Sequence, residues 1–113
     1  MATLPKSYQR FTRNYPKIWQ AYNRLGALSH EAGPLDEKTR ELVKLAMSIG
    51  ATMEGAVHSH TRRAREAGAT PAEIRHLVLL GLTTLGFPST MAALTWVEDV
   101  LRKPSPRKGK ARK

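Results

Sequence analysis

The fold of this chain is decided by residues 67–85, which read AGATPAEIRHLVLLGLTTL. Gly68 is typical of the position just past a helix end, where the backbone turns left-handed. Residues 70–73, Thr-Pro-Ala-Glu, then form a capping box with proline at the first helical position, which signals the start of another helix. The segment therefore predicts one helix that stops before Gly68 and a second, apolar helix that runs to about Leu85.

Helical periodicity continues on both sides of this segment, and no alternating strand pattern occurs. Asp36 and Thr52 are expected as N-caps, and Gly-Phe-Pro at 86–88 breaks the helix that precedes it. The other helices are expected at about residues 16–33, 37–50, 52–67 and 89–101. Short connections imply packed neighbouring helices. We therefore predict an all-α fold, a compact bundle of five main helices plus an N-terminal arm that packs irregularly.

Charge and composition divide the chain into three parts. The net charge is +10, but residues 102–113 hold seven lysines and arginines and no acid, whereas residues 1–101 hold twelve basic and nine acidic side chains. The expected parts are an arm over 1–16, a helical domain over 17–102 and a disordered basic tail over 103–113. The tail suits either an electrostatic arm for nucleic acid or another polyanion, or a solubilising segment.

The absence of cysteine limits the chemistry of the chain. With no cysteine among the 113 residues, disulfides, thiolate nucleophiles and cysteine-ligated metals are excluded.

No apolar run approaches the roughly 20 residues that span a bilayer, and the first residues lack the apolar core of a signal peptide. We expect a soluble cytoplasmic protein with no membrane partner.

A helix over residues 53–67 would carry one apolar face, made of Met53, Ala56, Val57, His60, Ala64 and Ala67. His60 lies near the centre of that face and needs a hydrogen-bond partner there. Glu41 lies at the edge of the apolar stripe of the preceding helix, so antiparallel packing would bring it to His60. A carboxylate that orients an imidazole makes a general base near neutral pH, although a satisfied core pair without a substrate accounts for both residues as well.

The polar side of the same helix carries further candidates. His58 and His60 point about 200° apart on a helix, so they cannot chelate one metal, and no metal site is predicted. Glu54 precedes His58 by one turn and can pair with it on the surface. Arg63 belongs to a basic cluster with its neighbours at 62 and 65. This cluster is either a solvated helix face or an anion clamp for a carboxylate ligand.

The segment from Gly33 to Leu101 resembles the carboxymuconolactone decarboxylase and alkylhydroperoxidase D-like family. The resemblance is carried by GPLDEKTRELVKLAMSIG, then HSHTRRAREAGATPAEI, then LTTLGFPSTMAALTWVEDVL. It implies the all-helical architecture of that family and a homo-oligomer, a trimer or a hexamer. The expected helix around Leu77 is apolar over most of its circumference, and this independently favours association.

The peroxidase branch of the family has a glutamate, then a Cys-x-x-Cys pair beginning twelve residues later, then a histidine four residues further on. Glu41 and His60 match the glutamate and the histidine, whereas Met53 and Ala56 stand where the cysteines would be. Dithiol chemistry is therefore not expected. The decarboxylase branch, a lyase, needs neither a cysteine pair nor a cofactor and takes a lactone carboxylic acid. It often carries a further acid before the histidine, where Glu54 lies nearby.

Two functions of different classes follow. The first is a cofactor-free acid–base enzyme on a small carboxylated or lactone substrate, with His60 as general base or acid and Glu41 as its orienter. In this enzyme Glu54, His58 and Arg63 are candidates for binding the substrate. The second is a non-catalytic helical oligomer, a scaffold that binds a polyanion through its basic tail.

Overall fold

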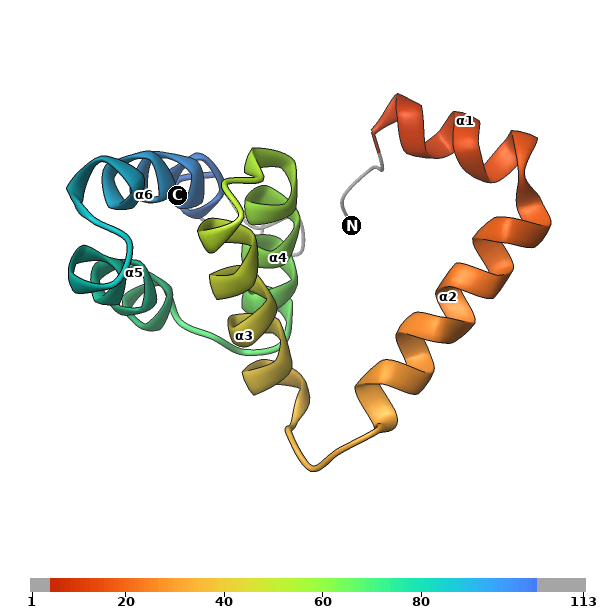
Figure 1. Ribbon diagram of the computed structural model, residues 1–113, viewed down its shortest axis with the longest axis horizontal. Coiled ribbons are helices and arrows are strands. Elements are labelled where there is room, and N and C mark those ends of the chain that lie inside the picture. Colours follow the sequence, from red (N-terminus) through yellow and green to blue (C-terminus); the bar gives the residue numbers. More distant parts are fainter. Residues whose placement is uncertain (1–4, 104–113) are drawn as a thin grey trace. The chain divides into compact units, whose positions relative to one another are not determined.

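A computed structural model describes residues 5–103, and no strand occurs among them. Its helices are α1 (Lys6–Asn14), α2 (Pro16–Glu31), α3 (Glu37–Gly50), α4 (Glu54–Glu66), α5 (Pro71–Leu79) and α6 (Phe87–Leu101), with a 3₁₀ turn η1 (Leu80–Thr83) after α5 (Figure 1). The all-α fold is confirmed. Backbone contacts divide the chain into two units, with the boundary in the sequence between Pro34 and Leu35. The basic tail was expected over residues 103–113, and its residues from 104 onward lie outside the part of the chain that the structure describes.

The first unit contains α1 and α2. The N-terminal arm, for which no helix was expected, is helical over Lys6–Asn14. Tyr15 separates the two helices with φ −134° and ψ 59°, because the residue before a proline is disfavoured in the helical conformation. Ring contacts run through the junction: the centroids of Phe11 and Tyr15 are 5.3 Å apart and those of Phe11 and Trp19 are 6.4 Å apart. This aromatic cluster joins the two helices.

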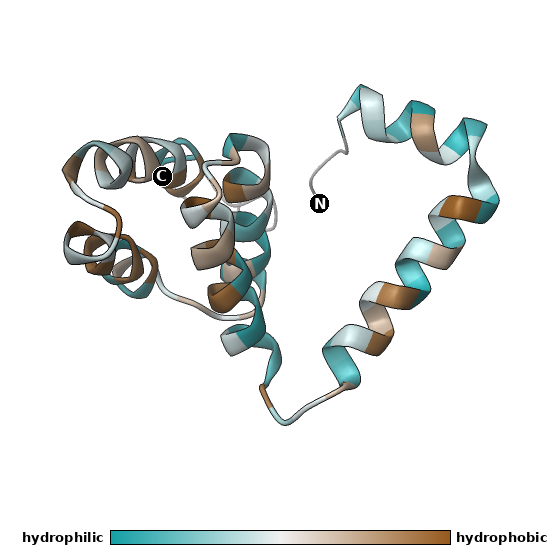
Figure 2. Ribbon diagram, viewed as in Figure 1, coloured by the Kyte–Doolittle hydropathy of each residue, from teal (hydrophilic) through white to brown (hydrophobic). Residues whose placement is uncertain are grey.

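The second unit, from Leu35 onward, contains the remaining helices and the hydrophobic core. A three-residue turn makes an antiparallel pair of α3 and α4, and α6 packs against α4 and α5 (Figure 1). Apolar segments, coloured brown in Figure 2, recur along these helices. The core consists of Leu45, Ile49, Val57, Ala64, Ala69, Ile74, Val78, Ala93 and Val97. These residues hold α3 and α4 in a fixed register.

Both α3 and α4 end in the same hydrogen-bonded motif, but with different residues at its left-handed position. After α4, Gly68 has φ +103° and the Ala69 N–H donates to the carbonyl of Ala64, as the sequence predicted. After α3, Thr52 has φ +58° and the Met53 N–H donates to the carbonyl of Ser48. Thr52 was expected to cap α4, so that expectation was wrong; the N-cap of α4 is Met53, with no side-chain cap. A β-branched residue in this conformation is strained.

Replacing Thr52 by glycine should therefore stabilise the protein. A left-handed conformation costs a non-glycine residue roughly 1–2 kcal/mol, and glycine avoids this strain. Glycine also loses more backbone freedom on folding, which offsets about 0.5–1 kcal/mol of the gain. We expect a net gain of about 0.5–1 kcal/mol in the free energy of unfolding, measured by urea denaturation. The matched change at the other motif, Gly68→Ala, should lower it. Equal losses from both variants would contradict this account.

The helix that starts at Thr70 is shorter than predicted. Its capping box is present, with the Glu73 N–H donating to Thr70 Oγ1 and the Thr70 N–H donating to Glu73 Oε1. The α-helical part, however, ends at Leu79 and continues as the 3₁₀ turn η1. A Cβ added to Gly81 would lie 3.1 Å from Thr90 Oγ1 of α6, so the glycine permits this close approach. The Gly81 carbonyl accepts bonds from three successive N–H groups at 84–86, which closes the turn.

None of the helices within residues 5–103 combines the length and the apolar composition needed to cross a bilayer.

Candidate functional site

The α3–α4 hairpin brings Glu41 and His60 together. Glu41 shares a stripe of α3 with Leu45 and Ser48, and all three are buried. His60 lies on α4 one turn before Ala64, which is also buried. His60 Nδ1 lies 2.9 Å from Glu41 Oε1, and the side chains of the two residues are 15% and 7% exposed. The hairpin thus places a carboxylate–imidazole pair at the edge of the core.

The charge of Glu41 determines which nitrogen of His60 carries the proton. Burial raises the pKa of the Glu41 carboxyl, but the hydrogen bond with His60 and the positive charges of His60, Arg63 and Lys44 outweigh it, so the pKa lies below its ordinary value. An ionised carboxylate can only accept hydrogen bonds, so Nδ1 of His60 is the donor. The neutral ring then has its lone pair on Nε2. No hydrogen bond to Nε2 occurs within the described part of the chain.

This pKa predicts a loss of stability in acid. A carboxyl whose pKa is lower in the folded state than its ordinary 4.5 stabilises the fold above that pH. Its contribution disappears as the pH falls through the folded value. The Glu41→Met variant should therefore show a shallower fall in melting temperature than the wild type below pH 4.5. Parallel curves for the two proteins would show that Glu41 makes no such contribution.

Glu54 and His58 do not join this pair. His58 Nε2 lies 3.0 Å from Asp99 Oδ2 of α6, whereas His60 faces α3. The expected surface partner of His58, Glu54, lies in the same cluster on the α6 side. Asp99 was missed by the sequence analysis, because its approach to α4 depends on packing between helices far apart in the chain. Arg63 is exposed and close enough to act electrostatically on Glu41.

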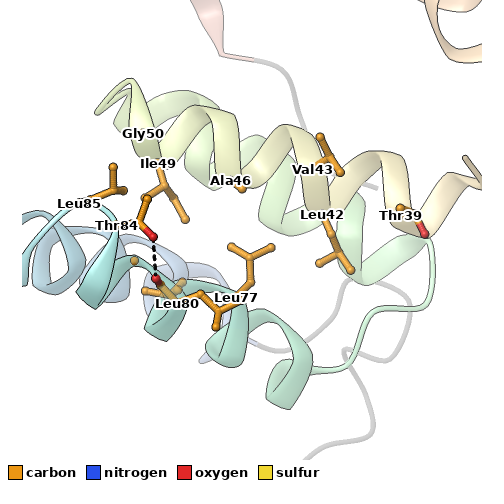
Figure 3. A pocket seen from close by; sticks show the side chains of 12 residues that line it. Thr39, Leu42, Val43, Ala46, Ile49, Gly50, Leu77, Leu80, Thr84 and Leu85 are labelled. Atoms are coloured by element: carbon orange, nitrogen blue, oxygen red, sulfur yellow. Dashed lines mark hydrogen bonds between the residues drawn. The ribbon is translucent and has the colours of Figure 1, made fainter.

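An apolar groove of about 390 Å³ lies on the other side of α3. Leu42, Ala46 and Ile49 of α3 face Leu77 and the η1 turn across it (Figure 3). Neither Glu41 nor His60 lines this groove, because both lie on the α3–α4 side. The groove and the carboxylate–imidazole pair are therefore separate features.

Comparison with known proteins places this chain in a family. Residues 16–99 match the carboxymuconolactone decarboxylase family. The chain belongs to this family. A solved structure with the same fold is the apo form of a carboxymuconolactone decarboxylase family protein from Legionella pneumophila. Its TM-score is 0.75 at 23% identity, and the match covers 86% of this chain and 87% of that one.

A curated relative is less informative about activity. An uncharacterised protein from Haemophilus influenzae is 42% identical over 59 residues, which are 52% of this chain and 52% of that protein. The chain thus matches about half the length of that relative. Membership in the carboxymuconolactone decarboxylase family is shown by the match of residues 16–99.

The two positions that the family resemblance matches with the peroxidase cysteines lie at the N-terminal end of α4. Met53 is the exposed N-cap, and Ala56 lies in the first turn. This is the helix end at which a thiol would have a lowered pKa, so the scaffold suits a thiolate that the chain does not supply. As a carboxymuconolactone decarboxylase family member without cysteine, it offers no thiol for dithiol exchange.

We expect the wild-type protein to show no dithiol-dependent turnover of an organic hydroperoxide. Introducing Met53→Cys together with Ala56→Cys should create a pair that can form a disulfide, because residues three apart on a helix have Cα atoms about 5 Å apart. Loss of titratable thiols on mild oxidation would report it. Robust peroxidase turnover by the metal-free wild type would contradict the prediction.

Proposed function

We propose that the chain is a cofactor-free acid–base enzyme, a lyase that acts on a small carboxylated lactone. The single observation behind the proposal is the 2.9 Å contact between His60 Nδ1 and Glu41 Oε1. It fixes the ring orientation and the tautomer, leaving Nε2 as the atom that exchanges a proton with a substrate. The His60 side chain is 15% exposed, so part of it is open to solvent.

The proposed step is a decarboxylation. The carbon–carbon bond to the substrate carboxylate breaks, carbon dioxide leaves, and the bonding electrons pass into an enolate conjugated with the lactone carbonyl. Protonated His60 then donates its Nε2 proton to the carbon, and solvent reprotonates the ring. Glu41 stabilises the imidazolium form and holds the ring in place throughout.

Positive charge near the pair supports an anionic substrate. Arg63 lies one turn beyond His60 on α4, and Lys44 lies one turn beyond Glu41 on α3. Both act on Glu41 electrostatically, which places cationic groups around the pair. A guanidinium such as that of Arg63 matches a carboxylate in two parallel hydrogen bonds. Arg63 is therefore the proposed anchor for the substrate carboxylate.

The test is release of carbon dioxide from carboxymuconolactone by the purified protein. Because general acid–base catalysis contributes about 10²–10⁴-fold, His60→Gln should lower turnover by at least about 10²-fold. His76→Gln is the matched control, since His76 is exposed on α5 and outside the pair. Melting curves of both variants establish that they are folded. Undiminished turnover by folded His60→Gln, or none by the wild type, would contradict the proposed reaction.

We also propose that the chain assembles as a homo-oligomer. Large apolar side chains are exposed around the end of α5 and η1, with Leu79 at 50% and Leu80 at 60%. The apolar groove beside them adds to this surface. Light scattering should give at least twice the 12.6 kDa of one chain. A stable monomer at micromolar concentration would contradict this. An oligomer without any turnover would favour the alternative function, a non-catalytic scaffold.

A further inference from the structure

A second cluster of ligating side chains lies between α4 and α6. It consists of Glu54, His58 and Asp99, and one ligand atom from each lies within 4.8 Å of the other two. His58 Nε2 and Asp99 Oδ2 are 3.0 Å apart. The three side chains are exposed or half-buried, so an ion can reach them from solvent. This cluster is separate from the Glu41–His60 pair, which lies between α3 and α4.

The packing of two helices assembles the three residues. Glu54 and His58 are one turn apart on α4 and therefore lie on the same face. Asp99 comes from the last turn of α6, where unpaired carbonyls favour a cation. The adjacent Glu98 holds both Arg75, at 2.6 Å, and Arg102, at 3.5 Å. These two arginines are thus engaged by Glu98, and neither pairs with Asp99 within the described residues.

We propose that Glu54, His58 and Asp99 bind a divalent transition-metal ion, zinc in the first instance. One imidazole nitrogen and two carboxylate oxygens make a donor set that zinc accepts, whereas calcium and magnesium favour oxygen alone. Zinc–ligand distances of about 2.0–2.2 Å put ligand atoms roughly 3.3–3.6 Å apart in a tetrahedral site. Small rotations of exposed side chains bring the present separations into that range.

Charge balance also favours the ion. The two carboxylates of Glu54 and Asp99 are close enough to repel each other, and the Glu54 carboxylate makes no hydrogen bond or ion pair among residues 5–103. A divalent cation neutralises both carboxylates and leaves the imidazole of His58 as a neutral ligand. Three protein ligands fill three positions of a tetrahedral ion and leave the fourth to water or another small ligand. The site is therefore an open one.

The experiment is a titration of the full-length protein with zinc chloride, followed by calorimetry, and with cobalt chloride, followed by its visible absorption. We expect one ion for each chain and bands typical of four-coordinate cobalt. Even residues that only support a ligand change metal affinity by 10–100-fold, so Asp99→Asn and Glu54→Gln should each weaken binding by at least ~10-fold. His76→Gln, which changes an exposed histidine of α5, should bind as tightly as the wild type.

Circular dichroism without metal checks that each variant is folded. Glu54→Gln alters an exposed side chain that has no hydrogen-bond or ion-pair partner among residues 5–103, so it tests the site even if Asp99→Asn destabilises α6. Retention of full affinity by folded Glu54→Gln would overturn the proposal. So would weak, non-stoichiometric binding by the wild type, or binding that is lost with His76→Gln.

Discussion

Replacing Leu45 by alanine should lower the free energy of unfolding by about 2–5 kcal/mol. Leu45 is fully buried on the stripe of α3 that also carries Glu41, and it belongs to the core with Ile49 and Val57. The change removes buried methyl groups and leaves a cavity between α3 and α4, because the surrounding helices relax only in part. Urea denaturation followed by far-ultraviolet circular dichroism measures the loss.

Met47 of the same helix provides the control. Its side chain is 67% exposed, so Met47→Ala should change the free energy of unfolding by no more than about 0.5 kcal/mol. Equal effects of the two substitutions would show that the α3–α4 interface is not packed as described here. The position of Glu41 relative to His60 would then lose its physical basis.

Replacing Glu41 by methionine should be the second most damaging change. Methionine keeps much of the volume but removes the acceptor of the His60 Nδ1 proton. A buried donor left without a partner costs about 1–3 kcal/mol. Glu66→Met, at an exposed position on α4, should cost no more than about 0.5 kcal/mol. If Glu41→Met left the free energy of unfolding unchanged, water would be replacing the carboxylate as the hydrogen-bond partner of His60 at no cost.

Local signals in the sequence were sufficient for most helix boundaries of the second unit. Asp36 was expected to cap α3, and its Oδ1 accepts the N–H of Thr39 at 2.9 Å. The capping box at Thr70 and the left-handed Gly68 were predicted in the same way. Such motifs depend only on residues within a few positions of one another, so one sequence is enough to detect them.

Three features of the fold were not predicted from the sequence. The 3₁₀ turn after Leu79 forms where Gly81 approaches Thr90 of α6, and no local pattern encodes that contact. Thr52 was expected to begin a helix because threonine is a common N-cap, but it lies instead at the left-handed position of the hydrogen-bonded motif that ends α3. The helix α1 was overlooked because Pro5, at its N-cap, makes no side-chain cap.

In the candidate site, too, one contact could be predicted from the sequence and another could not. The contact between Glu41 and His60 could be predicted, because two adjacent antiparallel helices that pack through their apolar faces place these two residues opposite each other. The approach of Asp99 to His58 could not, because α6 is separated from α4 by α5 and η1. Catalytic roles for Glu41 and His60 stay a prediction that the activity measurements test.

The measurement that tests the account most directly is a double-mutant cycle with Glu41→Met and His60→Leu. Each single change leaves a buried polar group without its partner, whereas the double variant leaves neither. We expect the double variant to lose at least about 0.5 kcal/mol less stability than the sum of the single losses. Additive losses within about 0.5 kcal/mol would show that the pair is not coupled, and would contradict the proposed site.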